Sequence, residues 1–334
     1  MQKLSPIPPS LIELSVSRAG LVTTTEALSA NLTKPRIGRL IEHGEITRKA
    51  NGVLLLKEGG ARCRDRVGKI QFGRLLAAHL GVMATGPTSA AAGQSALAIM
   101  GAAGLPATVK TEFTLKSGGS TCLDKRFSNR REPYRESYLI NGIRVVSPTM
   151  ALAQSVLSLH RNNAVSVMES LVRQKILDTN ALTKSRELIA RRPGAVAARP
   201  WFDLVDARSD SPAETFARLN CTSLGYPPDA IQLEVFNREG HFIARVDLAW
   251  RFPDKRWLLG EIDGFDYHSS PDDVRRDRVR QNKLVGRNTV LRRWSGADAM
   301  SDRLATDIHL LLKGEGWRPN QVPTAECNRL VLVE

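Results

Sequence analysis

The chain has 334 residues, of which 42% are hydrophobic, so it is long enough for two or three domains and can bury a sizeable core. Lysine and arginine total 48 against 34 acidic residues, and the formal net charge of +14 favours a polyanionic partner, with nucleic acid ahead of an anionic membrane. The first residues, MQKLSPIPPS, lack the apolar core of a signal peptide, and the Ala/Gly-rich stretch 90–105 is too short and too weakly apolar to span a bilayer. Four scattered cysteines without a CxxC pair are typical of a reduced cytoplasmic protein. We therefore expect a cytoplasmic protein with no membrane partner.

Residues 1–60 are predicted to form three short helices followed by a hairpin. The segment PSLIELSV has helical apolar spacing, TTTEALSAN begins with a capping box of Thr23 and Glu26, and KPRIGRLIEHGE predicts a third helix. Two β-type runs in EITRKANGVLLLK flank Asn51 and Gly52, a strong signal for a two-residue hairpin. This order of elements predicts a winged helix-turn-helix.

Basic residues fall on two parts of this predicted winged helix. In one interpretation the third helix enters the major groove of double-stranded DNA and the wing touches phosphates. In the other, the winged helix makes protein contacts and these charges are solvated. The candidate DNA-binding residues are Lys34, Arg36 and Arg39 on the third helix, and Arg48 and Lys49 on the wing.

Residues 61–200 are predicted to form an α/β middle domain in which we find no catalytic motif. A helical run over Val67–Leu80 precedes two strand-like pieces, TVKTEFTL and ESYLINGIRVVS. A helix, TMALAQSVLSLH, then starts at Ser147-Pro148 and is followed by AVSVMESLVRQKIL. Between the strand-like pieces lies DKRFSNRREPYR, whose arginines and aromatics could grip a nucleic-acid backbone but are more often a solvated loop, which we favour. The segment RRPGAVAARP marks a domain boundary.

Residues 201–316 contain the candidate catalytic and metal-binding residues. SPAETFARLNCTSLG predicts a helix, and IQLEVFN, HFIARVDLAW and RWLLGEIDGF predict three strands, the first two joined as a hairpin. PDDVRRDRVRQNKLVG predicts a charged helix, NTVLRRW a strand, and residues 298–313 a last helix. The expected order is therefore α-β-β-β-α-β-α, and residues 317–334 form a tail without predicted structure.

Two acids lie in apolar surroundings on consecutive predicted strands. Asp247 follows Val246, and Glu261 follows Gly260. Burial of such carboxylates is costly unless they are paired or hold a metal. Two carboxylates on adjacent strands can share a hard cation, Mg²⁺ or Mn²⁺, with Glu214 of the preceding helix as a third ligand. Such a cation would polarise a phosphodiester and activate water for hydrolysis.

Each acid also has a purely structural interpretation. Glu214 stands three residues after a serine and completes the pattern of a helix-capping box. The strand acids could form ion pairs with basic residues close to them in sequence. The structural partners would be Ser211 for Glu214, Arg245 or Arg251 for Asp247, and Lys255 or Arg256 for Glu261.

The charged helix concentrates positive charge near these acids. From residue 272 to 293 there are eight lysines and arginines and three acids, and eight minus three leaves +5. A phosphate backbone docked near the carboxylates is the simplest use of that field, although a solvated, salt-bridged helix would have the same sequence. The candidate DNA-binding residues here are Arg276, Arg280 and Lys283.

The segments RVDLAW, LLGEIDGFDYH, RRDRVRQNKL and VLRRW, in that order, resemble the restriction-endonuclease-like domain related to very-short-patch repair endonucleases. Together with the winged helix and a middle segment ending in GIRVVSPTMALAQ, they resemble AbiEi-type antitoxins of type IV toxin–antitoxin systems. The resemblance extends to about residue 316 and implies a mixed α/β chain whose C-terminal domain has the PD-(D/E)XK nuclease fold.

The resemblance implies metal ligation by Asp247 and Glu261, with Glu214 as the helical acid, and proton transfer by His268. The motif's lysine should stand two residues after Glu261, where this chain has Asp263, itself a candidate ligand. Two functions stay open: an Mg²⁺- or Mn²⁺-dependent DNA endonuclease, or a transcriptional regulator or antitoxin with an inactive nuclease fold and a cognate toxin as partner. The sequence does not determine the oligomeric state.

Overall fold

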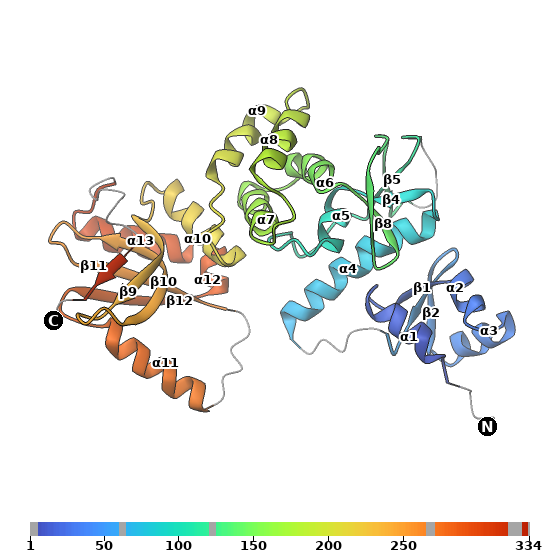
Figure 1. Ribbon diagram of the computed structural model, residues 1–334, viewed down its shortest axis with the longest axis horizontal. Helices are drawn as coiled ribbons and strands as arrows, with labels where there is room; N and C mark the ends of the chain where they lie inside the picture. Colours follow the sequence, from blue (N-terminus) through green and yellow to red (C-terminus); the bar gives the residue numbers. More distant parts are fainter. Residues whose placement is uncertain (1–5, 60–64, 120–124, 265–270, 320–328, 333–334) are drawn as a thin grey trace. The chain divides into compact units, whose positions relative to one another are not determined.

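The structure is a computed structural model, and it describes residues 6–59, 65–119, 125–264, 271–319 and 329–332 (Figure 1). The chain is a mixed α/β protein, as predicted, and it divides into two compact units. Unit 1 comprises residues 1–164 and 174–203, and unit 2 comprises residues 165–173 and 204–334. None of the helices in the described ranges combines the length and apolarity that crossing a bilayer requires.

The first part of unit 1 contains a small antiparallel sheet in the strand order β1-β3-β2, packed against three helices. The predicted capping box is present, because Thr23 accepts from the backbone of Glu26 and the Glu26 carboxylate accepts from the backbone of Thr23. The predicted hairpin is also present, with Gly52 at φ +71° in its turn. β1 was not predicted. The elements are α1 (Pro9–Val16), β1 (Leu21–Thr23), α2 (Thr24–Ser29), α3 (Lys34–Glu42), β2 (Ile46–Ala50) and β3 (Val53–Leu56).

The second part of unit 1 contains a mixed sheet of the order β6-β5-β4-β8-β7 with helices around it. The strand-like piece predicted for ESYLINGIRVVS forms two strands, β7 and β8, which pair as a hairpin whose turn residues Asn141 and Gly142 have positive φ. The elements are α4 (Arg66–Thr85), β4 (Ser89–Ala91), α5 (Gly93–Ile99), β5 (Glu112–Leu115), β6 (Ser128–Arg130), β7 (Ser137–Ile140), β8 (Ile143–Val146), α6 (Pro148–Ser155), α8 (Thr179–Leu188) and α9 (Ala195–Ala198). α7 (Arg161–Arg173) begins in unit 1, and its residues 165–173 belong to unit 2.

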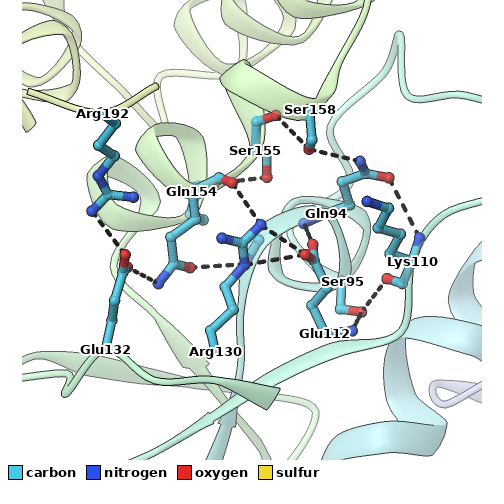
Figure 2. A network of polar contacts seen from close by, with 12 residues as sticks. Gln94, Ser95, Lys110, Glu112, Arg130, Glu132, Gln154, Ser155, Ser158 and Arg192 are labelled. Atoms are coloured by element: carbon cyan, nitrogen blue, oxygen red, sulfur yellow. Dashed lines mark hydrogen bonds and ion pairs between the residues drawn. The ribbon is translucent and has the colours of Figure 1, made fainter. Parts of the chain in front are cut away.

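The prediction of a solvated loop for DKRFSNRREPYR is confirmed only in part, because much of the segment is exposed but a strand also lies in it. β6 lies within it, and Arg130 forms an ion pair of 2.7 Å with the buried Glu112 (Figure 2). Glu112 in turn accepts from the backbone of Gln94, and the Gln154 side chain joins the backbone of Gly93 to Glu132. Because these buried groups satisfy one another, this network stabilises the middle sheet and α5 rather than offering a ligand site.

Unit 2 is built on a sheet of the order β12-β11-β10-β9-β13 (Figure 1). β9, β10 and β11 are antiparallel neighbours, whereas β12 and β13 lie parallel to β11 and β9. Apolar side chains of α10, α12 and α13 pack on one face, here called the α10 face, and Leu284 of α11 packs on the other, the α11 face. The elements are α10 (Pro212–Ser223), β9 (Ala230–Phe236), β10 (Phe242–Arg251), β11 (Trp257–Asp263), α11 (Pro271–Leu284), β12 (Thr289–Ser295), α12 (Gly296–Met300), α13 (Arg303–Gly314) and β13 (Arg329–Val331).

The predicted order of elements in residues 201–316 is confirmed, with two differences at the C-terminal end. The single last helix is divided into α12 and α13, because Ser301 takes an extended conformation between them. Residues 317–334 are not devoid of structure. Trp317 is buried in the core of the α10 face, and β13 adds a strand to the edge of the sheet.

Candidate functional site

The alternation of faces along β9 breaks at Gln232. In a regular strand, residues two apart lie on the same face of the sheet. Ile231 packs on the α10 face, whereas Leu233 packs on the α11 face. Gln232 between them has φ +52°, a left-handed conformation that is unfavourable for a residue other than glycine. The strand therefore changes which face its side chains point to at this residue.

β10 shows the same break at Asp247. Val246 belongs to the cluster of the α11 face and Leu248 to the cluster of the α10 face, although they are two residues apart. Leu248 pairs with Gly260 of β11, and at the next position the Asp247 carboxylate accepts from the backbone N–H of Ile262 at 2.7 Å. The carboxylate thus takes the place of a strand carbonyl where the ladder between β10 and β11 ends.

The register brings four polar residues to one row of neighbouring positions across the sheet. The pairings on either side of Gln232 place it opposite Asp247, and continuing the β10–β11 register by one residue places Asp247 opposite Glu261. Glu261 is paired with Arg293 across the parallel β11–β12 ladder. Asp247 and Glu261 thus lie on adjacent strands, as predicted, and Glu261 contributes to the raised pKa of Asp247. The sequence analysis missed Gln232 and the role of Arg293.

One amide connects the two most closely placed acids. Gln232 Nε2 donates to Glu214 Oε2 at 2.8 Å and lies 3.4 Å from Asp247 Oδ1. Glu214 also accepts from the backbone N–H of Asp210. The side-chain amide of Gln232 and the backbone N–H groups that donate to Glu214 and Asp247 are all neutral. Neither Glu214 nor Asp247 forms an ion pair with any residue that the structure describes.

The crowding of these acids raises their proton affinity. Burial and then the neighbouring Glu214 raise the pKa of Asp247 to about 7, and Glu261 contributes in the same direction. Burial also raises the pKa of Glu214. Raised carboxyl pKa values of this origin mark a site where negative charge is held at a cost in stability.

Arginines neutralise the other two acids. Arg280 of α11 contacts both oxygens of Glu261, with Nη1 at 2.8 Å from Oε1 and Nη2 at 3.1 Å from Oε2. Arg293 lies 3.8 Å from Glu261 Oε2 and forms a short ion pair with Asp263. Asp263, which stands where the motif has lysine, therefore meets an arginine from the neighbouring strand.

The carboxylates fit the ligand preference of a small hard cation, with Asp247 at the centre. Mg²⁺ is commonly held by one or two carboxylates and completes its shell with water and substrate phosphates. Asp247 and Glu214 provide such a pair. Glu261 could join them only by releasing Arg280. Within the described ranges, no three His, Cys, Asp or Glu side chains by themselves form a metal-binding group.

Of the structural partners considered for these acids, only Ser211 is found, and only in part. Ser211 does accept from the backbone of Glu214, but the Glu214 carboxylate accepts from Asp210 rather than completing the box. The remaining pairs replace those considered from sequence: Arg245 with Asp210, Arg256 with Asp254 and Glu315, and Arg280 and Arg293 with Glu261. His268 lies outside the described residues.

The predicted DNA-binding residues in residues 1–60 differ in exposure. Lys34, Arg39 and Arg48 are exposed. Arg36 is half-buried and donates to the carbonyl of Pro6 at 2.5 Å. Lys49 is half-buried. The most exposed positive charges of α3 and of the β2–β3 hairpin are therefore those of Lys34, Arg39 and Arg48.

The basic residues of α11 divide in the same way. Arg276 and Lys283 are exposed, whereas Arg280 is partly buried against Glu261. The helix thus presents cations to solvent and also inserts one into the acid row. A polyanion bound along α11 would be next to the carboxylates.

A buried ion pair supports the helix that carries Glu214. Glu169 of α7 is 1% exposed, pairs with Arg218 and accepts from the hydroxyl of Thr215. It also accepts from the backbone N–H of Asp206. Burial raises the pKa of Glu169. Sequence analysis missed this network because Thr215 and Arg218 lie 46 and 49 residues after Glu169 and the three residues match no motif.

Comparisons with known proteins leave the function open. No protein-family model matches the chain. Two proteins from two strains of Mycobacterium tuberculosis, both described as uncharacterized, are each 28% identical to it over 145 residues, which is 43% of this chain and 52% of theirs. The chain therefore spans about half the length of the curated relatives that it matches, and their names assign no activity.

Proposed function

We propose that this protein binds double-stranded DNA through its N-terminal part and α11, and that unit 2 is a nuclease-like domain of the PD-(D/E)XK type. The observation that carries the proposal is the row of Gln232, Asp247 and Glu261, with Glu214 directed at Asp247 from α10. Buried acids that are crowded and not neutralised are costly, and cation binding is a use that offsets this cost.

In the proposed DNA-binding part, α1–α3 and the β1-β3-β2 sheet form a winged helix. Lys34 and Arg39 of α3 face the major groove, and Arg48 of the hairpin contacts phosphate. Arg36 orders the segment before α1 through Pro6. Exposed cations on both elements support this arrangement.

In the proposed catalytic part, Asp247 is the central ligand of Mg²⁺ or Mn²⁺, with Glu214 as its neighbour and Glu261 available when Arg280 moves to phosphate. When bound, such a cation polarises a phosphodiester and makes a nucleophile of water at neutral pH. Arg293, fixed between Glu261 and Asp263, supplies a positive charge at this row, where the motif's lysine is absent. Arg276 and Lys283 hold the DNA backbone along α11.

A second candidate function rests on the same arginines. Because Arg280 and Arg293 neutralise Glu261 and Asp263, the domain could bind DNA without cleaving it, as a transcriptional regulator or an antitoxin paired with a toxin. In that case α11 and the winged helix keep their role and the acid row is a remnant of catalysis.

The experiment that separates the two is a cleavage assay on duplex, single-stranded and mismatched DNA with Mg²⁺ or Mn²⁺, repeated with a chelator. The endonuclease proposal expects metal-dependent nicking that Asp247→Ala abolishes without weakening DNA binding. Asp254→Ala, which removes an exposed acid from the same β10–β11 hairpin, is the matched control and should cleave normally. Binding without cleavage on every substrate would overturn the endonuclease proposal and leave the regulator.

A further inference from the structure

We infer that Gln232 is a positioning residue of this site, whose side-chain amide holds the carboxylates of Glu214 and Asp247 together without placing a positive charge beside them. The inference rests on the proposed function, because holding the two acids in this way matters only if they bind a ligand. Three features of the chain support it: the backbone at Gln232, the reach of its amide and the neutrality of that amide.

The backbone at Gln232 is strained at the middle of a strand. Its φ of +52° is the left-handed region, which non-glycine residues rarely occupy and which concentrates at functional sites. The strained residue is the point at which β9 changes faces, because Ile231 before it and Leu233 after it pack on opposite faces of the sheet. From this position the Gln232 side chain reaches Glu214 of α10.

The amide reaches two acids that come from different elements. It donates to Glu214 of α10 at 2.8 Å and lies 3.4 Å from Asp247 of β10. An amide nitrogen carries two hydrogens, so a single side chain can serve both carboxylates. The strained backbone of β9 is thereby tied to the relative position of the two acids.

The amide is also neutral, and this distinguishes it from the two arginines that donate to the other acids of the row. Arg280 and Arg293 satisfy Glu261 and Asp263 but cancel their charge. A lysine or arginine in place of Gln232 would do the same to Glu214 and Asp247 and would compete with a cation. An apolar residue would leave two carboxylates facing each other without a shared donor. Gln232 therefore joins Glu214 and Asp247 without cancelling the charge that either carboxylate carries when it is ionised.

The test uses the full-length chain with Gln232→Met, which keeps the length of the side chain and its backbone conformation but removes the donors. Lys255→Met is the matched control, because Lys255 is a second non-glycine residue of unit 2 with positive φ, at +73°, and is exposed. Binding of Mn²⁺ is measured by electron paramagnetic resonance. We expect Gln232→Met to weaken Mn²⁺ binding by about 10-fold or more, as for other residues that orient metal ligands, and Lys255→Met to leave it unchanged.

A second measurement separates this inference from the proposed function. The side-chain NH₂ signal of Gln232 is identified by NMR as the signal that disappears in Gln232→Met. We expect it to be protected from solvent exchange without cation and to shift when Mg²⁺ is added. If the signal is protected but does not shift with Mg²⁺, and the wild type does not bind Mn²⁺, the cation site is overturned. The placement of Gln232 between the two acids is then upheld.

An unprotected signal, or a Gln232→Met variant that binds Mn²⁺ as the wild type does, would overturn the inference about Gln232 itself. If Gln232→Met does not fold, Gln232→Asn replaces it, since asparagine tolerates positive φ and its shorter amide cannot reach both acids. The same loss of Mn²⁺ affinity is expected from it, and wild-type affinity would refute the inference.

Discussion

Replacing Asp247 with asparagine should make the cation-free protein more stable at neutral and alkaline pH. The carboxylate is held among Glu214, Glu261 and neutral donors, and its pKa is raised from 3.8 to about 7. The folded state therefore binds a proton that the unfolded state releases at lower pH. The stability that this proton provides is complete below about pH 4 and is lost as the pH rises toward 7.

The magnitude follows from the size of that shift. Each pKa unit corresponds to about 1.4 kcal/mol, so the shift of roughly three units sets a ceiling on the order of 4 kcal/mol for the loss of stability. Asparagine keeps an oxygen for the backbone N–H of Ile262 and places an amide where the charge was. We expect a gain of about 2 kcal/mol at pH 8, which corresponds to roughly 4–8 °C in Tm for a unit of this size.

The assay is thermal unfolding from pH 4 to pH 8, with and without Mn²⁺. The difference in Tm between Asp247→Asn and the wild type should grow as pH rises through the window from about 4 to 7, and Mn²⁺ should raise the Tm of the wild type alone. Asp254→Asn is the control, because Arg256 lowers the pKa of that exposed acid and no gain is expected. An Asp247→Asn variant less stable than the wild type at pH 8 would refute the crowding of acids at this site.

Three further predictions concern DNA binding and stability. Replacing both Lys34 and Arg39 with alanine should weaken binding to duplex DNA and, measured by fluorescence anisotropy over a salt series, lower the slope of log K against log salt by about 0.9 for each phosphate that the variant no longer neutralises. Arg218→Met should destabilise the protein to urea by about 3–5 kcal/mol, because it leaves Glu169 buried without its cation, and Glu169→Gln in the same chain should recover most of that loss. Trp317→Ala should cost about 3–5 kcal/mol in the same measurement, because Trp317 is buried in the core of the α10 face and donates to Asp229.

Local sequence predicted those parts of the fold that depend on near neighbours. The capping box of Thr23, the hairpin at Asn51 and Gly52, and the strands carrying Asp247 and Glu261 are each specified by residues within one element. Arg130 shows the limit of this reasoning. Its segment has the composition of a solvated loop, but the buried Glu112 of a neighbouring strand draws it into the sheet.

The candidate site shows the same limit more sharply. In AIQLEVF the apolar residues Ile231, Leu233 and Val235 alternate with polar ones, so the pattern places Gln232 with Glu234 on the opposite side of the strand. The structure separates Ile231 from Leu233 through the left-handed conformation of Gln232. No period in the sequence encodes that break, because it depends on contacts with α10 and β10. The partners of Glu261 were unpredictable for a related reason, since they come from α11 and β12.

The acids of the candidate site differ in whether a positive charge neutralises them, and this difference indicates whether they have a function. A domain that only bound DNA would gain stability by neutralising every acid of the row, as Arg280 and Arg293 do for the buried Glu261 and the half-buried Asp263. Glu214 and Asp247 are instead kept with neutral donors, at a cost that the raised pKa of Asp247 to about 7 expresses. Strain and unfavourable charge persist in proteins mainly where function requires them. The arginines next to this pair argue in the same direction, because they show that the fold can neutralise an acid in this row and does not do so for Glu214 and Asp247.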